Sequence, residues 1–226
     1  MPRAGLKTGF LLTFEGIEGS GKTTQLRVLA RRLRALGYQV VETREPGGAP
    51  ISEQIRTILL DLSTRGMDLR CELLLYLASR AQHLAETIRP GLEKGAVVLC
   101  DRFADATMAY QGYGRRLGPR TIARLNRFAT AGLVPDLAII LDIPVTLGLA
   151  RKRRMGGLDR LDRENEAFHQ TVRHGYLRIA RQNPRRVRVV DGTQPKDVVV
   201  RAIAGIVERR LRARKGGLTR VERHAV

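Results

Sequence analysis

The chain has 226 residues, of which 43% are hydrophobic, and this is enough to bury the core of one domain. No apolar run approaches the roughly 18 residues of a membrane span, so we expect no membrane partner. The formal net charge is +19, yet aromatic residues make up only 4% and tryptophan is absent. Stacking platforms for bases are therefore scarce, which favours a polyanionic small substrate over a nucleic acid. Two cysteines, Cys71 and Cys100, lack metal-ligand spacing and favour a reducing, cytoplasmic compartment.

Apolar segments alternate with amphipathic helical patterns along the chain. The predicted strands are GFLLTFEG, GYQVVETREPGG, GAVVLCDRF, PDLAIILDIP and RRVRVVDG. Helical patterns cover residues 22–36, 51–60, 68–89, 106–110, 119–131, 167–181 and 195–212. Continuous apolar strands separated by helices are typical of a parallel sheet covered on both faces, so the sequence predicts one α/β domain over residues 1–212. The basic tail, residues 213–226, has no clear packing pattern and is expected to fray.

A phosphate-binding loop follows the first predicted strand and opens the first predicted helix. The motif G-x-x-x-x-G-K-[ST] is met by Gly16, Ile17, Glu18, Gly19, Ser20, Gly21, Lys22 and Thr23, and Thr24 follows it. Glycines let backbone N–H groups surround an anion, and the helix N-terminus adds positive charge. Lys22 would reach the β- and γ-phosphates of ATP, and the Thr23 hydroxyl would hold Mg²⁺. The loop predicts an ATP site but does not identify the phosphoryl acceptor.

Charged residues mark the carboxyl ends of the next strands. Arg44 ends the second predicted strand, and Asp101 with Arg102 ends the third. Ligands of open α/β sheets bind over these ends, so all three residues would face the P-loop. An apolar strand that ends in Asp also resembles a magnesium-binding Walker B segment, and both Asp101 and Asp142 fit that description. The adjacent Arg102, which could clamp a phosphate, favours Asp101.

Four segments, FEGIEGSGKTTQ, TREPGG, DRF and AYQG, resemble in this order the signatures of thymidylate kinases. LVPDLAIILD and LDRLDRE fit the same pattern, and the resemblance covers roughly residues 10–200. It implies a P-loop NTPase-type parallel five-stranded sheet flanked by helices, as in nucleoside monophosphate kinases, with a short lid near residues 151–162. It also implies phosphorylation of dTMP to dTDP by ATP with Mg²⁺, in a cytoplasmic homodimer.

The resemblance implies a role for each residue near the base and the sugar of dTMP. Tyr76 would stack on thymine, and Arg80, one helical turn further on, would hydrogen-bond the thymine O4. Tyr110 would lie under the sugar, where it disfavours a 2′-hydroxyl, and Gln111 would be a polar contact nearby. Ala106 stands where a serine is common, so discrimination between dTMP and dUMP stays open.

The resemblance also implies roles around the phosphates. Arg44 would bind the phosphate of dTMP, and Arg102 would lie between the donor and acceptor phosphates. Glu18 occupies a P-loop position where the family carries an acid that accepts a hydrogen bond from the 3′-hydroxyl of the acceptor sugar. A carboxylate beside phosphates needs such a partner and nearby cations to offset the repulsion.

Positive charge on the transferring phosphoryl group is expected from a lid. The P-loop has no arginine, whereas ARKRRMGGLDR contains Arg151, Arg153, Arg154 and Arg160. A closing lid can deliver such charge and exclude water. Met155 interrupts the alternate spacing of lid arginines that bacterial relatives often show, so the arginine that contacts the phosphoryl group stays open. The predicted catalytic residues are Lys22, Asp101, Arg102, Arg151 and Arg153.

Two alternatives accompany this prediction. The first is a kinase for another nucleoside monophosphate, such as dUMP. The second is a P-loop ATPase that acts on nucleic acid, suggested by the net charge of +19. A nucleic-acid ATPase has no need of Arg44, Tyr76 and Tyr110 together, so these three residues favour the kinase.

Overall fold

Five parallel strands form the centre of the molecule. The computed structural model describes residue 6, residues 8–64 and residues 66–221. The strands are β1 (Phe10–Glu15), β2 (Val40–Arg44), β3 (Val97–Asp101), β4 (Leu137–Asp142) and β5 (Val187–Asp191), in the order β2-β3-β1-β4-β5. Every neighbouring pair is parallel. The predicted five-stranded parallel sheet is confirmed.

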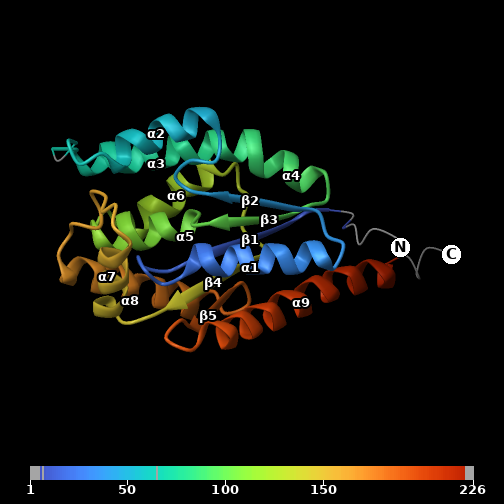
Figure 1. The fold of residues 1–226 in the computed structure, drawn as a ribbon. Coiled ribbons are helices and arrows are strands. Elements are labelled where there is room, and N and C mark those ends of the chain that lie inside the picture. Colours follow the sequence, from blue (N-terminus) through green and yellow to red (C-terminus); the bar gives the residue numbers. More distant parts are fainter. Residues whose placement is uncertain (1–5, 7, 65, 222–226) are drawn as a thin grey trace.

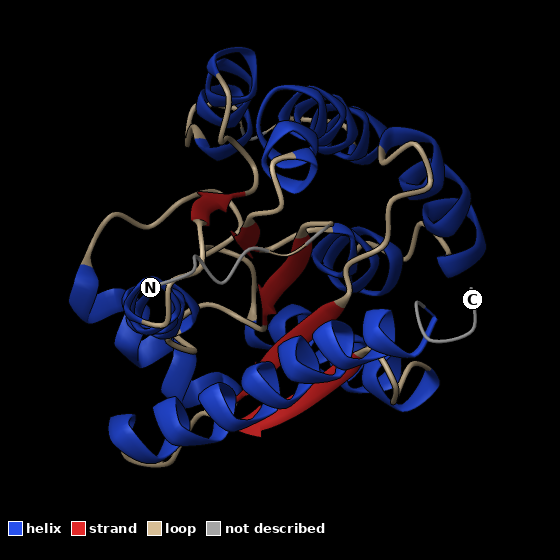
Figure 2. Ribbon diagram, turned by 90° about the vertical axis from the view of Figure 1, so that its right-hand side faces the viewer, coloured by secondary structure: helices blue, strands red, loops and turns tan. Residues whose placement is uncertain are grey.

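Helices cover both faces of the sheet (Figures 1 and 2). One face packs against α1 (Lys22–Ala35) and α9 (Lys196–Val221). The helical segments of the other face are α3 (Leu69–His83), η1 (Leu84–Ile88), α4 (Arg89–Glu93), α5 (Ala104–Thr107), η2 (Met108–Gly114), α6 (Pro119–Ala129) and α8 (Glu166–Gln182), with α2 (Pro50–Leu60) packed on α3. The remaining helix, α7 (Val145–Met155), lies next to the P-loop.

The alternation of side chains along β1 explains the two layers. Phe10, Leu12 and Phe14 are buried with α1 and α9, whereas Leu11 is buried with η1 on the opposite face. Successive side chains of a strand point to opposite faces, so a strand covered on both sides is apolar throughout. The buried central strand fixes the position of the loop that follows it.

Two helices contain widened π-type turns that the sequence did not predict. The predicted helix 68–89 becomes α3, η1 and α4, and the N–H of Arg89 bonds to the carbonyl of Leu84, five residues back. Pro90 has no N–H for the usual bond to Glu86, which explains the change at this point. The second widened turn, η2, contains the AYQG motif, and such turns are frequent at functional sites.

Helix α7 was also not predicted, and the P-loop explains its unusual sequence. A Cβ atom added to Gly148 would lie 2.5 Å from the carbonyl oxygen of Glu18, and one added to Gly19 would lie 2.2 Å from the carbonyl oxygen of Gly148. The two backbones therefore approach too closely for any side chain. Because α7 contains this glycine and an arginine run, it lacked a recognisable helical pattern.

The last helix is longer than the sequence predicted. α9 continues past Arg212 to Val221, and Gly216 and Gly217 do not interrupt it. The final part of the predicted tail, residues 222–226, lies outside the described residues. Among the described residues, none of the helices combines the length and apolar character required to cross a membrane.

Candidate active site

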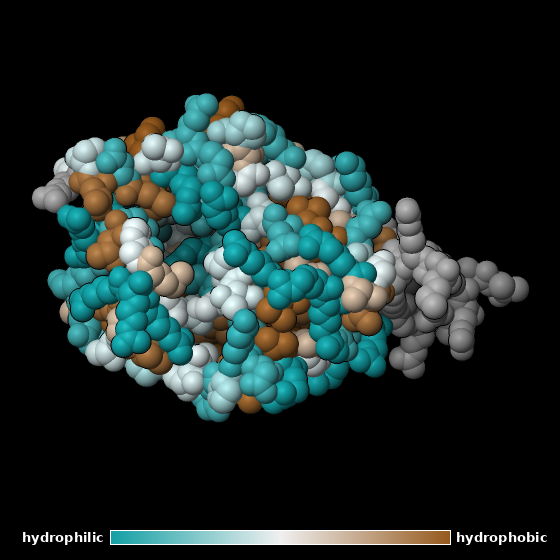
Figure 3. All heavy atoms as spheres, in the orientation of Figure 1, coloured by the Kyte–Doolittle hydropathy of each residue, from teal (hydrophilic) through white to brown (hydrophobic). Residues whose placement is uncertain are grey.

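A large cavity lies over the carboxyl ends of β1, β2 and β3. The register pairs Asp101 of β3 with Phe14 of β1 on one side and with Arg44 of β2 on the other. The P-loop, which follows β1, therefore lies beside Arg44 and Asp101. The cavity has a volume of about 570 Å³, and it opens where the surface is hollowed in Figure 3. This volume falls in the usual range for small-molecule sites.

The P-loop holds Lys22 at one end of this cavity, which is called the donor end below because the phosphoryl donor would bind there. Its ammonium group donates to the carbonyls of Gly16 at 3.1 Å and Ile17 at 2.8 Å, and to the hydroxyl of Ser20 at 3.3 Å. Burial and the charge of Arg102 lower the pKa of Lys22 to about 8. An anion at the helix N-terminus would offset both effects. The predicted phosphate loop is therefore assembled around a buried cation.

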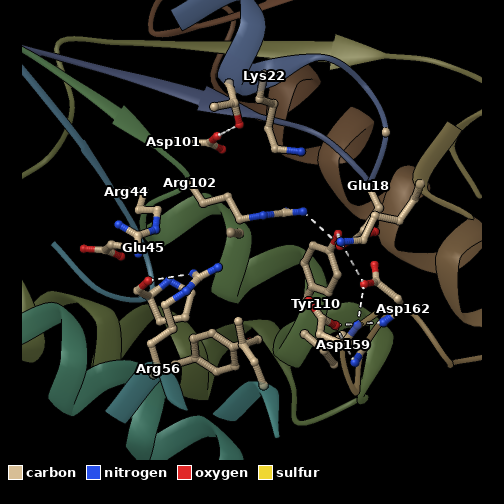
Figure 4. A pocket seen from close by; sticks show the side chains of 18 of the residues that line it. Glu18, Lys22, Arg44, Glu45, Arg56, Asp101, Arg102, Tyr110, Asp159 and Asp162 are labelled. Carbon is tan, nitrogen blue, oxygen red and sulfur yellow. Dashed lines mark hydrogen bonds and ion pairs between the residues drawn. The ribbon is translucent and has the colours of Figure 1, made fainter. Parts of the chain in front are cut away.

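Thr23 and Asp101 meet next to Lys22 on the cavity wall. The Thr23 hydroxyl donates to Oδ2 of Asp101 at 2.5 Å, and both residues line the cavity. Asp101 is labelled in Figure 4. The alternative acid, Asp142, forms a bidentate ion pair with Arg173 and does not line the cavity. The geometry therefore separates two aspartates that looked alike in sequence.

Arg102 extends across the middle of the cavity between its two ends (Figure 4). Its backbone has a φ of 71°, an uncommon conformation for a residue with a side chain and one that clusters at functional sites. The guanidinium donates to the Gly16 carbonyl at 3.0 Å, to Oε1 of Glu18 at 2.9 Å and to the Tyr176 hydroxyl at 3.2 Å. Its carbon also lies 4.9 Å from the centre of the Tyr110 ring.

Glu18 is the acid of the P-loop and stays ionised in this site. Its Oε1 accepts hydrogen bonds from Arg102 and, at 2.5 Å, from the Tyr110 hydroxyl. Burial acts to raise the pKa of Glu18, but the charges of Arg102 and Lys22 and the hydrogen bonds outweigh it and hold the pKa well below its ordinary value. A full negative charge is thus available close to the phosphate-binding residues.

Arg80 lies within a buried polar network at the other end of the cavity. This end, which Arg44 and Tyr76 also line, is called the acceptor end below. Its Nε donates to Glu45 at 2.8 Å, and a terminal nitrogen donates to Asn126 at 2.6 Å. His83 contacts the other oxygen of Glu45 at 3.0 Å. Arg80 is 1% exposed and lines the cavity, so these contacts fix its guanidinium at the cavity wall. The predicted pairing of Arg80 with Tyr76 on one helix face is consistent with this, because Tyr76 lines the same cavity.

A second network holds Gln111. Its side-chain nitrogen donates to Glu72 at 2.8 Å, and the same carboxylate forms ion pairs with Arg115 at 3.2 Å and Arg160 at 2.6 Å. Gln111 lines the cavity together with Arg44, Ala106, Thr107 and Tyr110. Because Arg160 belongs to the predicted lid, this network connects the lid to the helix that carries Tyr76.

The predicted lid arginines separate into two groups. Arg151 and Arg154 line the cavity, and Arg151 also donates to the Gly19 carbonyl at 3.4 Å. Arg153 does not line the cavity and is exposed. On a helix, residues three apart share a face, whereas residues two apart do not, so α7 turns Arg153 away from Arg151. Met155 is 80% exposed at the end of the helix.

Several lining residues had not been predicted as part of the site. Arg56 of α2 lines the cavity and donates to the Pro46 carbonyl at 2.8 Å, and Glu45, Lys152, Asp159 and Asp162 also line it. Arg56 lies four residues after the buried Ser52, and this helical spacing was the only available signal. Glu45 was visible in TREPGG, but its ion pair with a residue 35 positions away was not.

A parallel sheet with a P-loop at one end of a cavity, and arginines and a tyrosine at the other, defines a P-loop nucleotide kinase of the nucleoside monophosphate class. A family model described as thymidylate kinase matches residues 14–203. The chain belongs to the thymidylate kinase family, as the sequence motifs predicted.

Individual relatives agree with the family model. A thymidylate kinase of Pseudomonas entomophila is 52% identical over 206 residues, covering 89% of this chain and 98% of the relative. One of Geobacter sulfurreducens is 49% identical over 209 residues, with 90% and 98% covered. A crystal structure of thymidylate kinase from Ehrlichia chaffeensis superposes with a TM-score of 0.73 at 33% identity, covering 89% of this chain and 99% of that one.

Proposed function

We propose that the protein transfers the γ-phosphoryl group of ATP to the phosphate of dTMP, which gives dTDP. The observation that carries the proposal is one cavity in which Arg102 extends between the P-loop and the end lined by Arg44 and Tyr76. The acceptor phosphate is already an anionic nucleophile, so no strong general base is needed. Catalysis then depends on positioning and on neutralising charge.

The donor end would bind ATP as its magnesium complex. Thr23 and Asp101 offer the hydroxyl and carboxylate oxygens that Mg²⁺ prefers. Mg²⁺ in such sites is held by one or two protein oxygens together with substrate phosphates, so the ATP phosphates would complete the coordination. The ion would neutralise charge on the phosphates. Lys22 would contact the β- and γ-phosphates, and Asp101 would act on the ion directly, through water, or by orienting Arg102.

The acceptor end would bind dTMP through its three parts. Arg44 and Arg102 would bind the phosphate, and Tyr76 would stack on the base. Arg80 would donate to the thymine O4, since its other hydrogen bonds already fix the guanidinium. Tyr110, with Gln111 beside it, would exclude a 2′-hydroxyl. Glu18 would accept a hydrogen bond from the 3′-hydroxyl.

The lid would supply positive charge to the transferring group. Arg151 and Arg154 are the candidates for this role, because both line the cavity next to the P-loop. Arg153 stays a proposal that requires α7 to move when the lid, residues 151–162, closes. Closure would also exclude water from the γ-phosphoryl group.

We also propose a homodimer formed through α3 and α6. Leu74 of α3 is 58% exposed and Phe128 of α6 is 87% exposed, and the two helices share an apolar cluster beneath them. Large exposed apolar side chains often mark interfaces. Light scattering that gives the mass of a monomer at micromolar concentration would contradict this. The free thiols of Cys71 and Cys100 fit the cytoplasmic location, which stays a prediction.

The proposal is tested by a coupled ATP-consumption assay with Mg²⁺ and dTMP, dUMP, dCMP or UMP in parallel. We expect rapid turnover with dTMP and almost none with UMP or dCMP. Comparable turnover with dUMP would indicate that Ala106 and Thr107 leave the base pocket permissive. No turnover with any monophosphate, together with ATP consumption on addition of DNA, would contradict the kinase proposal and support the nucleic-acid ATPase.

A further inference from the structure

A buried polar contact lies behind Glu18, on the side away from Arg102. Oε2 of Glu18 is buried without a hydrogen-bond partner among the described residues, and so are both ring nitrogens of His169 on α8. The two residues face each other, with Nδ1 of His169 3.4 Å from Oε2 of Glu18. Leaving buried polar atoms unpaired destabilises a folded protein. Such a pair within reach of each other in an active site requires an explanation.

The packing around His169 restricts how it can be used. The side chain is 1% exposed, and the Phe168 ring lies edge-on to the imidazole with 5.5 Å between ring centres. The imidazole therefore has no route to solvent and little freedom to turn. With its proton on Nδ1, a small shift would complete a hydrogen bond to Oε2 of Glu18.

The hydrogen-bond acceptor positions of the Glu18 carboxylate show what a contact with His169 would achieve. A carboxylate has about four lone-pair sites. Arg102 and Tyr110 occupy two of these at Oε1, and His169 is placed to occupy a third at Oε2.

We propose that His169 is a positioning residue that holds Oε2 of Glu18 in place, so that the carboxylate keeps one orientation toward the 3′-hydroxyl of the acceptor sugar. This inference rests on the proposed function, because it needs a deoxynucleotide acceptor at Glu18. His169 itself does not touch the substrate. Its effect should therefore appear only with acceptors that carry the hydroxyl group.

The test compares dTMP with 3′-deoxy-dTMP, which lacks that hydroxyl, at saturating ATP. His169→Phe should raise the KM for dTMP about tenfold, which is the size expected for a hydrogen bond to a charged group. It should leave the KM for 3′-deoxy-dTMP within twofold. His169→Asn, whose amide can reach the same oxygen, should recover most of the affinity for dTMP. His174→Phe, at the exposed histidine of the same helix, is the matched control.

The outcomes separate a positioning role from a structural one. Equal losses for both acceptors, or no loss for either, would overturn the inference. If His169→Phe does not fold, His169→Asn and His169→Gln are compared on the same two acceptors, and equal KM ratios to the unmodified protein would also overturn it. Glu18→Gln should weaken the use of dTMP far more than it weakens the binding of ATP. If the unmodified protein does not phosphorylate dTMP at all, the proposed function fails first, and the two failures are thereby distinguished.

Discussion

The donor and acceptor ends of the cavity are held together in different ways. At the donor end, the main chain holds the side chain, since Lys22 donates to two carbonyls of its own loop. At the acceptor end, side chains hold each other, as in the contacts of Arg80 with Glu45 and Asn126. The donor end depends on contacts within one loop. The network at the acceptor end joins three separate segments, so a residue that binds substrate there also stabilises the fold. Substitutions at the two ends should therefore have different consequences.

The largest effect is expected from Lys22→Met at the donor end. Turnover should fall about 10²–10³-fold, as for other preorganised groups that stabilise transition-state charge. The melting temperature should not fall, because a buried ammonium whose pKa is lowered by burial is removed. Steady-state kinetics and thermal denaturation measure the two effects, with Arg27→Met on the exposed side of α1 as control. Loss of stability together with activity would show that the donor end is also coupled to folding.

Arg80→Met at the acceptor end should combine both effects. It leaves Glu45 buried without its main partner, which costs about 3–5 kcal/mol of unfolding free energy. The KM for dTMP should also rise, because the contact to O4 is lost. Urea denaturation and kinetics measure the changes.

A double variant tests the coupling directly. Adding Glu45→Gln to Arg80→Met removes the uncompensated charge and should recover part of the stability, but not the affinity for dTMP. Additive losses in the double variant would contradict a coupled network.

A smaller effect is expected within the lid. Arg151→Ala should lower kcat about tenfold with little change in the KM for dTMP, because Arg151 lines the cavity. Arg153→Ala should change kcat less than Arg151→Ala, because α7 turns Arg153 outward. A larger loss for Arg153→Ala would instead support the sequence-based assignment and would require α7 to move on closure. Single-turnover kinetics would locate either effect in the transfer step.

The last prediction concerns Glu15, the buried final residue of β1. Burial and the charge of Asp105 raise the pKa of Glu15 from 4.5 to about 8. The folded state then binds more protons than the unfolded state between these values, so stability should fall as the pH rises from about 5 to 8. The melting temperature of Glu15→Gln should depend less on pH over this interval. An unchanged pH dependence would show that Glu15 is not the group responsible.

The sequence predicted the donor end almost completely, for a physical reason. The P-loop needs glycines, Lys22 and Thr23 at fixed spacing within one segment, so its chemistry can be read locally. The sheet was equally accessible, because strands covered on both faces are continuously apolar. The sheet was confirmed.

The acceptor end was predicted only where the family motifs cover it. The motifs placed Arg44, Tyr76 and Tyr110, and all three line the cavity. The partners that hold the site together, such as Glu72 and Asn126, come from distant segments and have no local pattern. Helix α7 was missed for the same reason, since Gly148 is explained only by the backbone of Gly19 that packs against it.

The most direct test of this comparison is isothermal titration of dTMP into the protein without ATP. The account predicts saturable binding at one site per chain, because Arg80 and Gln111 are already held in place by protein contacts. Addition of a non-hydrolysable ATP analogue should change the affinity by less than about threefold. Binding of dTMP that appears only after the analogue is added would contradict a preformed acceptor end.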